Sequence, residues 1–323
     1  MNFEGQQILW VQTLWGVLHL LISSVVVMLL MMISVAFFIV IERKGLGMVQ
    51  LRQGPNKVSV KGILQAVADG VKLFKKEVSF PVCLSHFTFA LGPVICFFCA
   101  YSLYLVFPNS FGSNRFELGV LFFLCISSFS VYGVFLVGWL CDSRYAFLGA
   151  MRAIAQSISY EVFLSTVLFT SFLFVGSYDV FQGRSNEFFT SVFSLGLLML
   201  WFIAALAETN RAPFDFVEGE SELVAGYMVE YGGGGFALLA LAEYSNIMFM
   251  SMMTGVMFFN SGMSSFLFGD IIFSVWVVFI SYLFVLVRGT MPRYRYDLLM
   301  DLCWKILLPL SLGMFVLGAV ICC

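Results

Sequence analysis

Residues 14–41 read LWGVLHLLISSVVVMLLMMISVAFFIVI, and the charged triplet Glu42-Arg43-Lys44 follows them directly. The segment contains no Asp, Glu, Lys or Arg. A helix needs about 20 apolar residues to cross the roughly 30 Å of hydrocarbon in a bilayer. The segment therefore predicts a membrane-spanning helix, and the triplet marks the point where the chain leaves the hydrocarbon.

The rest of the chain repeats this alternation of long apolar blocks and short polar segments. Of the 323 residues, 61% are hydrophobic and only 11% are charged, whereas a soluble domain carries about 25% charged residues. We therefore expect an all-α membrane protein with about eight transmembrane helices in a single domain, residues 1–323. The seven further blocks are 87–107, 118–140, 158–175, 192–207, 236–259, 271–287 and 306–321.

Basic residues are concentrated on one side of this predicted membrane path. Segments 42–86, 141–157, 208–235 and 288–305 hold eight, two, one and four Lys or Arg, which is 15 of the 17 in the chain. Such an excess marks the inside of a membrane protein. We therefore expect these four segments to be the inside loops, with both termini outside.

The first inside loop, 42–86, is too long for a turn and contains a segment with helical periodicity. One face of this segment is apolar and the opposite face is polar. Such an amphipathic helix lies along the membrane surface or packs against a partner subunit. The apolar face holds Ile63, Val67, Val71 and Phe74, and the polar face holds Gln65, Asp69, Lys72 and Lys76.

Acidic residues gather in the third inside loop. Its six carboxylates surround a single basic residue, Arg211, and most such runs are solvated loops. Two further carboxylates, Glu161 and Glu243, fall inside predicted spans, where a charge costs at least about 2.5 kcal/mol. A buried polar path that relays protons is the functional alternative. The six loop residues are Glu208, Asp215, Glu218, Glu220, Glu222 and Glu230.

The basic residues of the inside loops have two interpretations. They act as topological determinants that contact lipid headgroups, or they form a rim that pairs with acidic residues of this chain or of a docked partner. Both interpretations stay open. The residues concerned form two sets, which are Arg43, Lys44 and Arg52 with Lys57, and Arg288, Arg293 and Arg295.

Other ligand sites find little support. Cys96 and Cys99 are spaced as C-x-x-C but lie within a span, where they pack as small apolar side chains, and His19 and His86 form no i, i+4 pair. We expect no metal ligand in this chain. The glycine run 232–235 lacks the trailing Lys of a phosphate-binding loop, so it indicates close helix packing, a non-helical helix start or a hinge. No segment has the basic pattern of a nucleic-acid-binding protein.

Three polar motifs closely resemble one respiratory-chain family. They are ERKGLGMVQLRQGPN at 42–56, AETNRAPFD at 207–215 with EGESE at 218–222, and PRYRYD at 292–297. They resemble the subunit 1 family of NADH–ubiquinone oxidoreductase, the membrane subunit of respiratory complex I nearest the quinone-reducing arm. The likeness covers nearly the whole chain in order. The chain departs from the family pattern at Ala66-Val67, Gly232-Gly233 and Leu298, and none of these departures removes a charge.

The resemblance implies an enzyme subunit with no redox centre of its own. Ubiquinone would be the substrate of the complex, and NADH, FMN and iron–sulfur clusters would bind to hydrophilic-arm partners. It also implies contacts with neighbouring membrane-arm subunits. Arg43, Arg52, Asp69, Arg211 and Phe214 would belong to the quinone tunnel or its junction, with Arg288, Arg293 and Arg295 of the basic rim. Glu161, Glu208, Asp215, Glu218, Glu220, Glu222 and Glu243, with Glu230 beside them, would form the proton path.

Two other functions remain as alternatives. A related energy-converting hydrogenase has a similar membrane subunit without quinone, and a stand-alone ion transporter would also bury carboxylates. A transporter should show internal repeats or broken spans, and neither is visible in the sequence. Because Phe is abundant (38 residues) and Lys and Arg are scarce (17 residues), we expect the mitochondrial inner membrane, with the basic loops in the matrix, rather than a bacterial plasma membrane.

Overall fold

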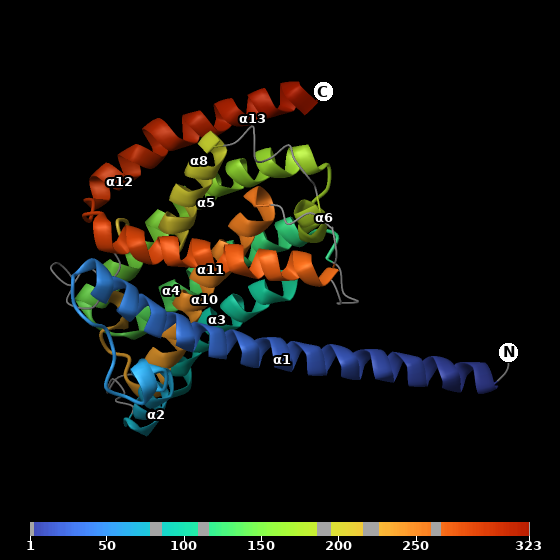
Figure 1. The fold of residues 1–323 in the computed structure, drawn as a ribbon, viewed down its shortest axis with the longest axis horizontal. Helices are drawn as coiled ribbons and strands as arrows, with labels where there is room; N and C mark the ends of the chain where they lie inside the picture. Colours follow the sequence, from blue (N-terminus) through green and yellow to red (C-terminus); the bar gives the residue numbers. More distant parts are fainter. Residues whose placement is uncertain are drawn as a thin grey trace.

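The computed structural model describes residues 3–77, 86–108, 116–185, 195–215, 226–259 and 266–322, and all regular elements in these ranges are helical. Figure 1 shows their arrangement. The bounds are α1 Phe3–Val49, η1 Val60–Gly62, α2 Gln65–Lys75, α3 His86–Leu103, η2 Tyr104–Val106, α4 Gly119–Leu140, α5 Arg144–Val175, α6 Val180–Ser185, α8 Leu195–Glu208, η3 Gly226–Met228, α10 Gly233–Phe258, α11 Phe266–Thr290, α12 Tyr296–Leu302, the π-helical turn η4 Cys303–Leu307, and α13 Leu308–Cys322.

The membrane-spanning character of the chain is confirmed. Within the described ranges, seven helical runs are long and apolar enough to cross a bilayer, and α8 is a shorter apolar helix at the position of the fifth block. The amphipathic helix expected in the first inside loop is also present, as α2. The seven runs are Ile22–Val49, His86–Val106, Gly119–Leu140, Arg144–Val175, Gly233–Phe258, Gly269–Thr290 and Tyr296–Ile321.

Two helices begin well before the apolar blocks that predicted them. Helix α5 starts at Arg144 rather than near residue 158, and the last run starts at Tyr296 rather than near residue 306. Hydropathy drops where Arg144 and Arg152 interrupt the apolar sequence. Backbone hydrogen bonds do not require apolar side chains, and the Ala, Leu and Met residues between these arginines are compatible with a helix. The apolar block therefore marks the hydrocarbon-spanning part of a longer helix.

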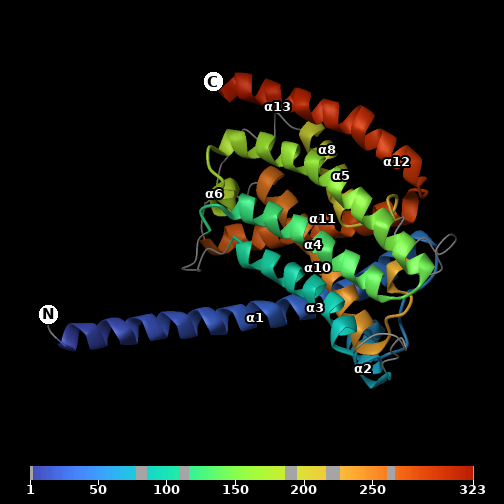
Figure 2. The same cartoon turned by 180° about the vertical axis from the view of Figure 1, so that it is seen from behind.

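The bundle has an interior layer and a lipid-facing periphery. Helices α1 and α13 lie on opposite sides of the bundle, with α5 and α10 between them (Figures 1 and 2). The largest fully buried side chains include Tyr160 and Phe163 of α5, Trp201 of α8 and Phe249 of α10. Most apolar side chains of the C-terminal part of α13 are exposed, which suits a surface that contacts lipid rather than water.

Small residues allow the close packing of α3, α4 and α5. A Cβ atom on Gly138 of α4 would lie 2.1 Å from the Cβ of Ala150 on α5. In a bilayer, apolar side chains gain little by leaving lipid, so close backbone approach at such residues supplies much of the helix association. This packing brings the start of α5 against the end of α4.

We call the end of the bundle where α1 and α11 finish the basic end. Helix α1 ends there because Leu51 has a left-handed backbone (φ 56°) and the N–H of Arg52 donates to the carbonyl of Gly47 at 2.8 Å, a common helix-terminating arrangement. Gly232 has an extended backbone and Gly233 has φ +54°. Helix α10 therefore begins within the glycine run, directly after the extended Gly232.

Candidate functional site

A buried carboxylate organises the basic end. Glu42, near the end of α1, is 5% exposed. It accepts a hydrogen bond from Arg211 at 3.1 Å and a second, short one from Arg288 of α11. A carboxylate in such a site is expensive unless it is paired and hydrogen-bonded. The two guanidinium groups satisfy that requirement and join three separate parts of the chain. We call Glu42, Arg211, Arg288 and Tyr244 the Glu42 cluster.

Arg211 is the central cation of the Glu42 cluster. Its guanidinium carbon lies 4.3 Å from the centre of the Tyr244 ring on α10, a cation–π distance. Burial alone would lower the pKa of Arg211, but the negative charge of Glu42, with further contributions from Tyr244 and Glu243, raises it above its ordinary value. Arg211 therefore stays protonated at every physiological pH.

The segment that carries Arg211 is fixed at both ends by one side chain. The amide nitrogen of Gln156, a fully buried residue of α5, donates to the carbonyls of Ala207 at 3.0 Å and Phe214 at 3.2 Å. Phe214 is also buried, and its ring stacks on Tyr294 with 6.0 Å between centroids. This arrangement holds the turn between α8 and Asp215 against the interior helices.

Two further ion pairs join arginines of the predicted basic rim to acidic side chains of the same chain. Arg293 pairs with the buried Asp215 at 3.3 Å, and Arg43 pairs with Asp69 of α2 at 2.6 Å. The first pair joins the loop after α11 to the segment that carries Arg211. The second fixes α2 to the end of α1. Asp215 is therefore a buried member of an ion pair at the basic end.

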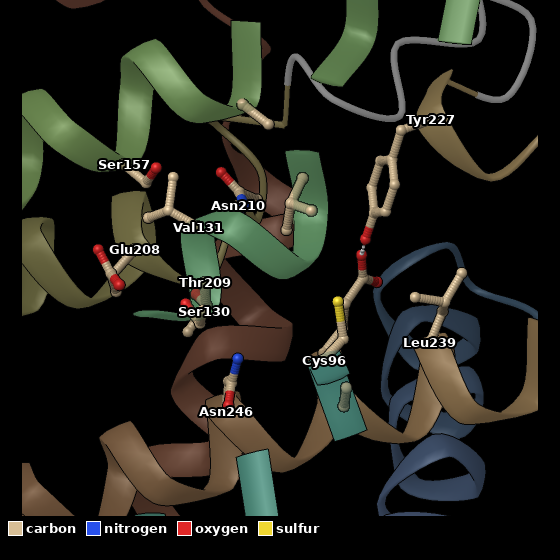
Figure 3. Close-up of a pocket in the computed structure, with 14 residues that line it drawn as sticks. Cys96, Ser130, Val131, Ser157, Glu208, Thr209, Asn210, Tyr227, Leu239 and Asn246 are labelled. Atoms are coloured by element: carbon tan, nitrogen blue, oxygen red, sulfur yellow. Dashed lines mark hydrogen bonds between the residues drawn. The ribbon is translucent and has the colours of Figure 1, made fainter. Parts of the chain in front are cut away.

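A polar cavity lies next to the Glu42 cluster, inside the bundle (Figure 3). Its volume is about 70 Å³, which holds several water molecules. Tyr227 points into it and donates a hydrogen bond to Glu243 at 2.5 Å. Glu208 lies across the cavity from this pair in Figure 3. The polar lining comprises Cys96, Ser130, Ser157, Glu208, Thr209, Asn210, Tyr227, Glu243 and Asn246.

Several polar atoms of the cavity wall need a partner. Glu208 Oε2, Asn210 Oδ1 and Asn246 Oδ1 are buried and have no hydrogen-bond partner within the part of the chain that the structure describes. Leaving such an atom unsatisfied costs about 1–3 kcal/mol. Water in the cavity would remove that cost. Glu161 lies one helical turn after Ser157 and interacts electrostatically with Glu208, which extends the acidic set along α5.

The cavity and the Glu42 cluster share two pieces of backbone. Asn210 lines the cavity and the next residue, Arg211, enters the cluster. Likewise Glu243 lines the cavity and Tyr244 lies under the Arg211 guanidinium. Glu243 also acts electrostatically on Arg211. The cluster and the cavity are therefore adjacent along the chain and interact electrostatically through Arg211 and Glu243.

The structure places the predicted site residues in different surroundings. Arg211 and Arg288 join the Glu42 cluster, and Glu208 and Glu243 meet at the cavity with Glu161 nearby. Glu230, Arg52 and Arg295 are exposed, and Arg52 donates to Gln50 at 2.8 Å. Glu218, Glu220 and Glu222 lie outside the described residues. The others make the ion-pair and ring contacts given above, and they are Arg43, Asp69, Phe214, Asp215 and Arg293.

Sequence reasoning missed Glu42 and Tyr244 as members of the site. The sequence pattern marks Glu42 only as the end of a membrane span. The buried residues Met31, Val35 and Phe38 continue to Glu42 at spacings of four, three and four residues, so helical periodicity could have placed it on the buried stripe of α1. Tyr244 carries no comparable signal, because an aromatic residue inside a span is ordinary.

The described residues hold no group of three or more His, Cys, Asp or Glu side chains placed to bind a metal ion. Their chemistry consists of carboxylates, a phenol, amides and guanidinium groups. Such groups can bind a polar ligand, hold fixed charges and exchange protons with water.

Known proteins resemble this chain over most of its length. A model of the NADH dehydrogenase family matches residues 22–319. NADH-ubiquinone oxidoreductase chain 1 of Anopheles gambiae is 47% identical over 295 residues, which cover 91% of this chain and 92% of that protein. The same-named protein of the squid Heterololigo bleekeri is 46% identical, with 93% and 97% covered. That of Myxine glutinosa is 44% identical, with 92% and 94% covered. This chain therefore belongs to the NADH dehydrogenase family.

Proposed function

We propose that this chain is a core membrane subunit of a proton-translocating NADH–ubiquinone oxidoreductase. In this role it contributes the ubiquinone access path and the first part of a carboxylate proton path. The observation that carries the proposal is the shared backbone of the two sites, in which Asn210-Arg211 and Glu243-Tyr244 each place one residue at the cavity and the next in the Glu42 cluster. Family membership supports a role in the complex. The geometry supports the assignment of the quinone path and the proton path to two adjacent sites.

The surface of the basic end, next to the Glu42 cluster, is the part of the chain suited to a quinone headgroup. Phe38, Ile247 and Phe284 supply apolar surface beside Glu42, Arg211 and Arg288 around a small cavity of about 10 Å³. That volume holds about one water molecule, so we assign the quinone path to the surface of the basic end, which a hydrophilic-arm partner would cover. There the guanidinium groups would stabilise the negative charge that develops as electrons enter the quinone.

Charge at the cluster would drive protonation in the cavity. Two unit charges about 4 Å apart interact by roughly 4 kcal/mol at an effective dielectric constant of 20, and one pKa unit corresponds to about 1.4 kcal/mol. A negative charge near Arg211 would weaken its hold on Glu243 and favour proton uptake there. Tyr227, water and Glu208 would pass the proton on, and Glu161 would continue the path along α5. NADH, FMN and iron–sulfur clusters would reside on the partner subunits.

We further propose the mitochondrial inner membrane as the location, with the basic end in the matrix and the chain as one membrane domain. The animal relatives and the excess of Lys and Arg in four loops support this assignment. Glu218, Glu220 and Glu222, which lie outside the described residues, stay in the proposal because their segment follows Asp215 directly in the sequence.

Neutralising a cavity carboxylate tests the proposal. In the assembled complex, Glu243→Gln keeps the shape of the side chain but removes its titration. We expect the quinone-reductase rate and coupled proton translocation to fall by about tenfold or more, which corresponds to at least ~1.4 kcal/mol. The matched control is Glu117→Gln, since Glu117 is exposed and outside the cavity wall. Wild-type rate and stoichiometry in Glu243→Gln would refute the proton-path assignment.

Quinone binding separates this proposal from its two rivals. A photoreactive ubiquinone analogue should label peptides that contain the Glu42 cluster, and excess ubiquinone should compete with it. A hydrogenase-type subunit would give no competed labelling. A stand-alone transporter would instead move ions after purification and reconstitution without the other subunits.

A further inference from the structure

We propose that α2 is a docking site for anionic phospholipids of the bilayer surface. The inference does not depend on quinone or proton chemistry. It starts from the orientation of α2, whose side with Gln65 and Asp69 faces the bundle and whose apolar side faces away from it.

The side of α2 that carries Asp69 is attached to the bundle. Asp69 accepts hydrogen bonds from Arg43 of α1 at 2.6 Å and from Gln65 at 2.7 Å. Helix α2 contacts α1 and α10 and lies at the periphery of the bundle, at the basic end, in both views (Figures 1 and 2). The Arg43–Asp69 pair neutralises the one acidic residue within the helix.

The apolar side of α2 is uncovered. Val67, Val71 and Phe74 are 59%, 62% and 78% exposed, and they succeed one another at four and three residues, which places them on one helical face. Ile63, just before the helix, extends the same face and is 54% exposed. Exposure of such an apolar face to water is energetically unfavourable. Acyl chains would cover it without distorting the helix.

The charges beside this face identify the headgroups. Lys72, Lys75 and Lys76 are exposed. Lys75 lies about 75° around the helix from the centre of the apolar face, and Lys72 and Lys76 lie further round on the same side. Segment 57–77 holds five lysines against two carboxylates, one of which is the neutralised Asp69. An apolar face with flanking lysines is the pattern by which interfacial helices bind anionic membranes, with long lysine stems that reach the headgroup level. A protein partner would require acidic groups that match three separate lysines.

Photocrosslinking in the assembled complex tests this inference. The complex is reconstituted in phosphatidylcholine vesicles that contain a trace of either phosphatidylglycerol or phosphatidylcholine with a photoreactive acyl chain. Labelled peptides are then identified by mass spectrometry. We expect peptides from 62–77 to be labelled by both probes, with a preference for the anionic one. Each lysine near the surface should contribute about fivefold to that preference.

Lysine variants give the decisive comparison. In Lys72→Gln, Lys75→Gln and Lys76→Gln combined, the preference should vanish while labelling by the zwitterionic probe persists. The control is Lys305→Gln, an exposed lysine that pairs with Asp301 instead. On the unmodified complex, about 1 M salt should abolish the preference as well, because the Debye length falls to about 3 Å. Equal labelling by both probes would overturn the charge-based recognition. No labelling of α2 by either probe would show that a protein partner covers it.

Discussion

Glu42 shows how one residue can tie a membrane bundle together. Its carboxylate is buried at the end of α1, yet both cations that hold it come from later parts of the chain, Arg211 and Arg288. The charge needs these partners because a lone buried carboxylate loses its hydration without compensation. The partners need Glu42 for the same reason. The basic end is therefore held by mutual neutralisation as much as by apolar packing.

Removing one member of this cluster should be costly. Arg211→Met keeps an unbranched apolar stem but leaves Glu42 with a single partner. We expect a loss of about 3–5 kcal/mol in the free energy of unfolding, the typical result of breaking a buried pair. The loss is measurable as a shift in the SDS-unfolding curve of the complex. Arg211→Lys should recover only part of it, because an ammonium group lacks the planar stacking surface over Tyr244. Arg52→Met, at an exposed position, should change stability by no more than about 0.5 kcal/mol.

The pH dependence of that contribution follows from the raised pKa of Arg211. A group whose pKa is raised on folding stabilises the protein fully below its unfolded value, and that stabilisation is lost only as the pH rises through the folded value. Both values lie far above physiological pH for this guanidinium. The stability difference between wild type and Arg211→Met should therefore show no loss from the arginine itself between about pH 6 and 9. A sharp decline in that window would contradict the assignment of Arg211 as the permanent cation.

At the scale of elements, the helices extend beyond their apolar blocks and the functional groups lie at their ends. Helix α5 starts at Arg144 and α10 starts within the glycine run. The start of α10 matters because it connects Tyr227 of η3 with Glu243 further along the helix. These two residues form a hydrogen bond at the cavity. A shift in the direction of the first turn would separate the phenol from the carboxylate.

Two neighbouring glycines test this start. Gly233 has φ +54°, where any other residue costs about 1–2 kcal/mol. Gly234 lies in the helix, and a Cβ there would meet no atom within 4 Å. Gly233→Ala should therefore destabilise the complex by about 1 kcal/mol and lower the quinone-reductase rate. Gly234→Ala should be neutral or stabilising by up to about 1 kcal/mol. Equal effects in thermal inactivation assays would show that the glycines serve packing alone.

At the scale of the molecule, an uneven charge distribution gives the bundle its direction. The Glu42 cluster, the Arg43–Asp69 pair and the Arg293–Asp215 pair all lie at the basic end. Helix α4 begins at the other end, next to the exposed Glu117. If the bundle spans the inner membrane as proposed, these two ends face different compartments.

Impermeant thiol reagents can test that orientation. Lys57→Cys lies at the basic end and Glu117→Cys at the other, and both positions are exposed. We expect Lys57→Cys to react in inverted inner-membrane vesicles, whose matrix side faces outward, and Glu117→Cys to react in mitoplasts. The unmodified chain is the control for its own cysteines. The reverse pattern would invert the proposed topology.

The sequence by itself determined the class of structure, the approximate number and order of spans and the helical character of the first inside loop. These properties follow from hydropathy and periodicity, which are local, because each span satisfies its own backbone hydrogen bonds in lipid. The acidic and basic residues were also visible, but not their pairing. Only the tertiary structure decided that Asp215 belongs to an ion pair with Arg293 while Glu208 and Glu243 share a cavity. It also turned the apolar face of α2 outward. Such choices depend on which groups from distant segments meet in a low-dielectric interior, where each charge must find its counter-ion or water.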